Sequence, residues 1–227
     1  MRPDRIALYS YAHVTWVSKQ QRGFERGDLP SPAEKVALLL LAIERLGDAG
    51  YGFLGLDHFA LPGDELFQAA RGGRLHRNFM GYTTKAGLGL LALGPSGISE
   101  LADCYAQSCR RSANWSERLA EGGLATIHGW ALSEDDQRRR WLIRRLMCQG
   151  EIDGAAYAST WGEELDLRVP GLAARLAPFE ADGLLVREAS SWRLTSIGRI
   201  FVRPIAMTFD AYLEPLADGS PRFSQTV

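Results

Sequence analysis

Three short segments of this chain carry side chains that could transfer a proton or bind a ligand. Asp57-His58 pairs a carboxyl group with an imidazole, which could move a proton or orient a ligand carboxylate. His76-Arg77 adds a guanidinium, which binds carboxylates through parallel N–H donors. Residues 79–84, Phe-Met-Gly-Tyr-Thr-Thr, combine an aromatic ring, a thioether and hydroxyl groups, a mixture that suits an adenosine.

Each segment also has a structural interpretation. Adjacent residues of a strand point to opposite faces, so Asp57 and His58 need not touch, and His58 could be a hydrogen-bonded structural histidine. His76-Arg77 could equally anchor its own loop by capping backbone carbonyl groups. A packed loop would have the same composition as residues 79–84. The residues alone leave these alternatives open.

The cysteines do not form a recognisable metal motif. There are three, Cys104, Cys109 and Cys148, and an odd, sparse set argues against a disulfide framework. No histidine lies close by in sequence to complete a zinc site. We interpret them as structural thiols in a reducing compartment and expect no metal ligands in the chain.

Length and composition limit the remaining classes. The 227 residues suffice for one large domain or two small ones, and 46% are hydrophobic. With 26 basic and 27 acidic residues, the net charge of -1 gives no general attraction to nucleic acid or anionic membranes. No apolar run approaches the ~20 residues of a membrane span, and the first residues have no secretory pattern. We therefore expect a cytoplasmic protein.

The first half of the chain predicts alternating strands and helices. Residues 5–12 and 51–56 are short apolar strands, and Ser31-Pro32-Ala33-Glu34 begins a helix with a capping box that ends near Gly50. A strand, a helix and a strand form a βαβ unit, so we expect the two strands to be parallel. A shorter helix at 64–70 and a last strand at 88–93 follow.

The second half predicts mainly helices. Their ranges are 113–121, a charged helix from Ser133, one from Asp153 to Trp161, 170–181, and one from Thr195 toward Leu213. Residues 184–187 and 192–194 flank a polar turn, which indicates a hairpin. Arg138 to Arg145 could belong to a DNA-recognition helix, but the preceding acidic residues favour a solvated helix face with local ion pairs.

Several segments together resemble the oxygen-independent coproporphyrinogen III oxidases, which are radical S-adenosylmethionine (SAM) enzymes of haem synthesis. They are Tyr-Ser-Tyr-Ala-His-Val at 9–14, Gly-Leu-Asp-His-Phe-Ala at 55–60, residues 75–84, Gly-Pro-Ser-Gly-Ile-Ser at 94–99, Asp-Cys-Tyr-Ala-Gln at 103–107 and Phe-Asp-Ala-Tyr-Leu at 209–213. The resemblance covers only the second half of such an enzyme. The family's C-x3-C-x2-C cluster motif belongs to the other half.

The resemblance, taken with the element pattern, implies an α/β fold in several parts. Residues 1–112 would be the last βα units of a partial TIM-like barrel, and residues 113–128 a connecting helix and linker. Residues 129–216 would be a mainly helical, winged-helix-like domain that covers the barrel mouth, and 217–227 a tail.

The resemblance also implies a reaction. In the family a [4Fe–4S] cluster cleaves SAM, and the resulting radical takes a β-hydrogen from a propionate of coproporphyrinogen III. Loss of carbon dioxide and an electron leaves a vinyl group, and two rounds give protoporphyrinogen IX. The implied partners are coproporphyrinogen III, an electron donor and the missing N-terminal radical-SAM half, on the same or a separate chain, with no nucleic acid and no membrane. Without the cluster cysteines, we expect the chain alone to be inactive.

Residues at the implied SAM sites can be carried over by position. Ala12, Phe79, Met80 and Ile98 align with SAM-contacting positions, while His58, His76 and Arg77 are candidates for binding the propionates of the substrate. The family usually has glutamine at Met80 and proline at Thr15, so this chain lacks a polar contact at the first position. A non-catalytic porphyrin- or haem-binding relative, or an interaction module, is the alternative function.

Overall fold

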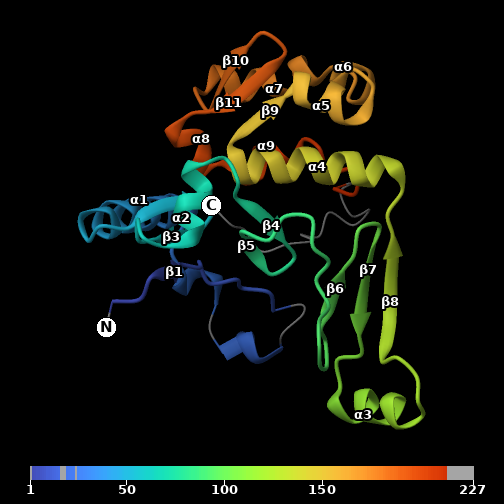
Figure 1. Ribbon diagram of the computed structural model, residues 1–227. Coiled ribbons are helices and arrows are strands. Elements are labelled where there is room, and N and C mark those ends of the chain that lie inside the picture. Colours follow the sequence, from blue (N-terminus) through green and yellow to red (C-terminus); the bar gives the residue numbers. More distant parts are fainter. Residues whose placement is uncertain (1, 16–18, 24, 214–227) are drawn as a thin grey trace.

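The computed structural model describes residues 2–15, 19–23 and 25–213, so the predicted tail at 217–227 lies outside the described residues. Their elements form a mixed α/β structure (Figure 1). The strands are β1 (Arg5–Ala7), β2 (Gly52–Gly55), β3 (His58–Ala60), β4 (His76–Asn78), β5 (Gly81–Thr83), β6 (Ile98–Glu100), β7 (Cys104–Ser108), β8 (Thr126–Ala131), β9 (Glu151–Asp153), β10 (Leu185–Glu188) and β11 (Ser191–Leu194). The helices are α1 (Pro32–Asp48), α2 (Glu65–Arg71), α3 (Ser112–Ala120), α4 (Glu134–Gln149), α5 (Gly154–Trp161), α6 (Leu165–Arg168), α7 (Leu172–Ala181), α8 (Ser196–Ile200) and α9 (Val202–Met207), with short 3-10 turns at Lys19–Gly23 and Arg26–Asp28.

Local capping signals place most helix starts where the sequence predicts them. Ser31 and Glu34 form the expected capping box of α1, with Pro32 in its first turn. Asp153 and Thr195 accept backbone N–H groups at the starts of α5 and α8. These signals act within four residues, so they do not depend on the rest of the fold.

The first two strands run in the same direction, as predicted, but they are not neighbours in the sheet. β3 lies between β1 and β2 and is antiparallel to both, so β1 and β2 share a direction without contact as partners. The chain reverses immediately after β2 because Gly55 and Leu56 both adopt positive φ angles, of 131° and 57°. All strand pairs between the described residues are antiparallel. Asp57 and His58 therefore lie at a hairpin turn rather than after a parallel strand.

The predicted strand at 88–93 is wrong. It contributes one isolated bridge, Leu90 to Glu100, and Leu88, Leu91 and Leu93 are exposed. The strands of this region are β6, β7 and β8, which form an antiparallel sheet in that order. Ile98 is the first residue of β6.

The C-terminal part contains the predicted hairpin, which is confirmed. β10 and β11 pair antiparallel, and β9 adds a third strand beside β11. The single last helix was wrong, because the chain forms α8 and α9 with a break at Phe201. Pro204 has no N–H group to bond the carbonyl of Ile200, which explains the break.

Helix α4 joins the two halves of the described chain (Figure 1). Leu142 and Leu146 are fully buried in a core formed mainly by α5 to α9 and the β9–β11 sheet. Cys148 belongs to a second core, with Leu54, Leu66 and Leu75. Conversely, Leu56 of the β2–β3 turn is buried in the C-terminal core. Each core thus contains a residue of the other half.

Helix α1 has an apolar surface that the described chain leaves uncovered. None of its residues is fully buried, and Leu38, Leu40 and Leu41 are exposed. Leu8 and Tyr9 beside it are exposed as well. Surfaces of this kind usually contact other protein. In the described residues, no helix has the length and apolar character needed to cross a bilayer.

We predict that Gly198→Ala strongly destabilises the C-terminal part. A Cβ atom at Gly198 would lie 1.9 Å from the carbonyl oxygen of Leu184, which also accepts the N–H of Thr195. The overpacking should lower the free energy of unfolding by about 3 kcal/mol, as measured by urea denaturation. Gly47→Ala is the control, because no atom lies within 4 Å of its added Cβ, and it should be neutral or stabilising. Equal midpoints for the two variants would contradict the prediction.

Candidate functional site

The loop at Phe79-Met80 is the turn of the β4–β5 hairpin. Asn78 pairs with Gly81, and the side chain of Asn78 accepts the N–H of Met80 at 3.0 Å. Gly81 has a φ angle of 137°, which is costly for other residue types, and an added Cβ would lie 3.7 Å from His58 Nε2. This turn directs the side chains outward, so Phe79 is 53% and Met80 76% exposed. Both are available to a ligand.

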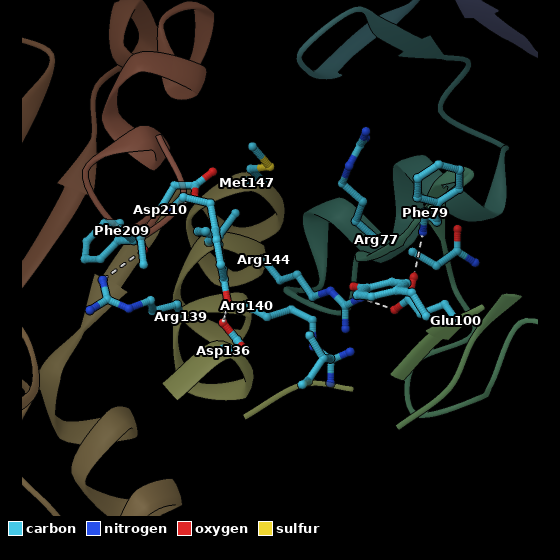
Figure 2. A pocket seen from close by; sticks show the side chains of 16 residues that line it. Arg77, Phe79, Glu100, Asp136, Arg139, Arg140, Arg144, Met147, Phe209 and Asp210 are labelled. Atoms are coloured by element: carbon cyan, nitrogen blue, oxygen red, sulfur yellow. Dashed lines mark hydrogen bonds and ion pairs between the residues drawn. The ribbon is translucent and has the colours of Figure 1, made fainter. Parts of the chain in front are cut away.

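Glu100 holds this loop from the neighbouring sheet. It is only 7% exposed, and its Oε2 accepts the backbone N–H of Phe79 at 2.8 Å. Its other oxygen accepts from Arg144 of α4 in an ion pair, as Figure 2 shows. One buried carboxylate therefore connects the loop, β6 and the helix of the C-terminal part. Charge-assisted bonds of this kind are among the stronger hydrogen bonds in proteins.

Asp57 and His58 do approach each other, because the turn brings their side chains together. His58 Nδ1 lies 2.6 Å from Asp57 Oδ1, and Arg203 of α9 lies 3.5 Å from Asp57 Oδ2. Burial opposes ionisation of Asp57, but the contact with His58 and the charges of Arg203 and Arg77 outweigh it and hold its pKa below the ordinary value. Asp57 is therefore an ionised anchor for a residue 146 positions away.

Tyr82 separates this pair from the interior. Its ring meets the His58 ring edge-on at 5.1 Å, and the Arg77 guanidinium lies 5.5 Å from the ring centre. Its hydroxyl donates to the carbonyl of Met147 at 3.0 Å. Burial raises the pKa of Tyr82 well above its ordinary value, so the phenol stays neutral. Tyr82 is thus a packing residue and a hydrogen-bond donor to α4.

His76 and Arg77 do not act as a pair, because they are successive residues of β4. Arg77 borders a cavity of about 380 Å³ with Phe79, Glu100 and Arg144. His76 borders another, of about 320 Å³, with Cys148 and Trp161. Successive strand residues point to opposite faces, which explains the separation.

The candidate SAM-contacting residues are only partly brought together. Phe79 and Ile98 border one cavity of about 440 Å³, along with Tyr105, His128 and Trp130. Met80 follows Phe79 in the turn but does not border that cavity. Ala12 lies on the N-terminal segment, where its carbonyl accepts from Gln21 at 3.0 Å. The structure therefore places Ala12 apart from the lining of this cavity.

The prediction for the arginines of α4 is confirmed for the local ion pairs but wrong for the solvated face. The local ion pairs Arg138–Glu134 and Arg139–Asp135 are present. However, Arg144 binds Glu100 and Arg140 donates to the carbonyl of Ala102, both across the interface with the N-terminal half. Glu100 and Arg203 were not identified from the sequence, since their partners are 44 and 146 residues away and no local pattern marks them.

Comparison with known proteins gives the same relatives along most of the chain. Residues 132–201 match the family described as the HemN C-terminal domain. The chain is 40% identical over 221 residues to the oxygen-independent coproporphyrinogen III oxidase of Escherichia coli K12. This match covers 96% of the chain and 48% of the relative. It is 38% identical over 227 residues to the Pseudomonas aeruginosa enzyme of the same name, covering 100% and 49%. The chain is thus similar to these oxidases along nearly its whole length.

The structure is similar to a solved member of the family. The Escherichia coli coproporphyrinogen III oxidase, described as a radical SAM enzyme, superposes with a TM-score of 0.87 at 39% identity. The match covers 93% of this chain and 49% of that one. The chain spans about half the length of the curated relatives it matches and corresponds to their C-terminal half.

The described residues do not fit the role of cluster ligands. They contain no group of three or more His, Cys, Asp or Glu side chains that could hold a metal ion. Cys109 and Cys148 are buried, and burial raises the pKa of the Cys148 thiol to about 12 despite the nearby charges of Arg77 and Arg144. A thiol of this kind is a poor metal ligand and nucleophile, because the thiolate is the reactive form.

We predict that Glu100→Leu loosens the Phe79 loop. The substitution removes the acceptor of the Phe79 N–H and leaves Arg144 without its carboxylate partner. The exchange rate of the Phe79 amide should rise about tenfold or more, the equivalent of about 1.4 kcal/mol. Glu100→Gln keeps an acceptor and should have a smaller effect. Hydrogen exchange with mass spectrometry of the 78–84 peptide measures both.

Glu151→Gln provides the matched control for the Glu100 variants. Glu151 of β9 forms an ion pair with Arg145, which lies on α4 next to Arg144, and Glu151 does not contact the loop. Its variant should leave exchange of the loop unchanged. Unaltered exchange of Phe79 in Glu100→Leu would show that the loop is held by other contacts.

We predict that His76 makes stability fall in mild acid. Burial lowers its pKa below the ordinary 6.5, and the charge of Arg144 adds to this while Glu100 opposes it. Below about pH 6.5 the unfolded chain therefore binds a proton at His76 more readily than the folded chain does. The free energy of unfolding is unaffected by His76 at neutral pH and decreases as the pH falls. Urea midpoints at pH 7 and pH 5 should differ less for His76→Gln. His128→Gln, at an exposed histidine of β8, is the control, and an unchanged pH dependence in His76→Gln would refute the prediction.

Proposed function

We propose that the chain is the C-terminal portion of an oxygen-independent coproporphyrinogen III oxidase, a dehydrogenase that converts two propionates of coproporphyrinogen III to vinyl groups. The observation that supports this is the relationship at 38–40% identity along nearly the whole chain to enzymes of that name. The reaction needs SAM and a [4Fe–4S] cluster, which supply the hydrogen abstraction. The cluster ligands would belong to the N-terminal half, which we propose as the obligatory partner along with an electron donor.

The described residues are compatible with a role in holding SAM. Phe79 and Ile98 border one largely apolar cavity, and the exposed Met80 lies next to Phe79 in the turn. An aromatic ring and an aliphatic chain suit the faces of an adenine base. We propose that these residues and Ala12 contact SAM, and that Met80 replaces a polar contact of other members with a thioether.

Polar side chains near the Phe79 loop would bind the substrate. We propose that His58 and Arg77 face the propionates of the substrate, because they flank Tyr82 beside the Phe79 loop. His76 would act at a separate place, since it borders a different cavity. What these residues contribute is placement of carboxylates and exclusion of water, through guanidinium and imidazole donors.

The architecture of the complete enzyme is part of this proposal. Residues 1–112 would supply the last units of a partial barrel, in which β1 and β2 run in the same direction with α1 between them. Residues 113–128 would connect them to a winged-helix-like covering domain at 129–216. The exposed apolar residues of α1 and of the segment at 8–11 would then contact the N-terminal half. A cytoplasmic location accords with this reaction.

The test is reconstitution with the N-terminal half of the Escherichia coli relative under anaerobic conditions. Conversion of coproporphyrinogen III and release of deoxyadenosine should require both halves. Ala12→Trp should block SAM binding sterically, while Met80→Gln should keep or strengthen it by restoring a polar partner. Arg118→Ala, on the distant helix α3, is the control. Normal affinity and yield in Ala12→Trp would disprove the site, and an inactive assembly with a complete cluster would disprove the function.

A further inference from the structure

The cavity between α4 and the Phe79 loop has the composition of a binding site. It has a volume of about 380 Å³. Its apolar walls include Phe79, Tyr105, Ile143 and Phe209, while four arginines border it. Figure 2 shows Arg140 and Arg144 extending from α4 toward Glu100, with the Arg77 side chain turned away from them.

Most of the charges around this cavity are already paired. Arg144 is bound to Glu100, and Arg139 donates to Asp135 and to the carbonyl of Phe209. The carboxylate of Asp136 caps α4 at Ser133 and accepts from the hydroxyl of Tyr212. Asp210 accepts the N–H of Tyr212. These groups stabilise the walls and have little capacity left for a ligand.

Arg77 and Arg140 both border this cavity and both have a buried Nη1 without a hydrogen bond within the described chain. Arg77 is turned away from the arginines of α4 (Figure 2), so the residue available to a ligand here is Arg140. Its Nη2 donates to the carbonyl of Ala102, and the group lies 5.9 Å from the ring centre of Tyr105. Its Nη1 is buried and makes no hydrogen bond within the described chain. A buried donor without an acceptor is unfavourable, and more so on a charged group. A fixed cation with an unused donor beside apolar walls is what an organic carboxylate requires.

We propose that this cavity binds a carboxylate carried on an apolar body, with Arg140 as the residue that recognises the charge. The proposal rests on the proposed function, since the ligand would be a propionate arm of the tetrapyrrole with its ring edge against Phe79 and Tyr105. Phe79 borders both this cavity and the one that contains Ile98. The bound arm would therefore lie next to the proposed SAM-contacting residues.

The test uses this chain alone and the stable porphyrin coproporphyrin III, followed by fluorescence titration, with its tetramethyl ester as the uncharged comparison. The chain should bind the acid at least tenfold more tightly than the ester. Arg140→Met should weaken binding of the acid about 10- to 100-fold, the range expected for a hydrogen-bonded charge pair, and leave the ester unaffected. Arg145→Met is the matched control, because Arg145 pairs with Glu151 and Asp153 and does not border the cavity.

A measurement on the unaltered chain covers the case in which Arg140→Met does not fold. Coproporphyrin III should protect Arg140 from modification by phenylglyoxal, as located by mass spectrometry, and the ester should not. The proposal is overturned by equal affinity for acid and ester, by normal binding in Arg140→Met, by lack of protection, or by no binding at all. These outcomes are separate from the reconstitution assay: an inactive assembly whose chain still binds the acid through Arg140 would contradict the reaction and leave the binding site standing.

Discussion

The arrangement of this molecule depends on helix α4 being buried on several sides at once. Leu142 and Leu146 complete the C-terminal core, and Cys148 completes the N-terminal one. A helix that contributes to two cores cannot move relative to either without exposing apolar surface, at about 25 cal/mol per Å². The position of the two halves relative to each other is therefore set by packing rather than by the chain connection between them.

Two arginines of α4 add specific polar contacts to this apolar packing, because they bind residues of the N-terminal half. Arg144 reaches the buried carboxylate of Glu100, and the same carboxylate holds the backbone of Phe79. Ion pairs with little access to water contribute modestly to stability, but breaking one partner away is costly. The geometry of the outward-facing turn is thereby coupled to the C-terminal helix. A change in the position of α4 would therefore alter the Phe79 turn.

A second long-range contact, between Asp57 and Arg203, also joins the N-terminal half to the C-terminal half. Asp57, in the turn between β2 and β3, faces both His58 and Arg203 of α9. Although burial raises the pKa of Asp57, the hydrogen bond from His58 and the charge of Arg203 hold it below its ordinary value, so the carboxylate stays ionised through the neutral range. The turn itself is strained, since Leu56 has a positive φ angle, and burial of Leu56 in the C-terminal core offsets that cost. Residues of the C-terminal half thus stabilise this turn of the N-terminal half.

The sequence by itself determined the local features and the similarity to the oxidases. Capping boxes at Ser31 and Ser133, the side-chain caps at Asp153 and Thr195, and the β10–β11 hairpin follow from residues within a few positions of each other. The motif at residues 75–84 carried the resemblance that the comparisons bear out. Only the tertiary structure decided that β1 and β2 are separated by β3, that His76 and Arg77 face different cavities, and that Arg140 and Arg144 point inward. The physical reason is range: a cap or a two-residue turn is settled by neighbouring backbone groups, whereas strand order and the partner of a charge depend on which distant surfaces are buried together.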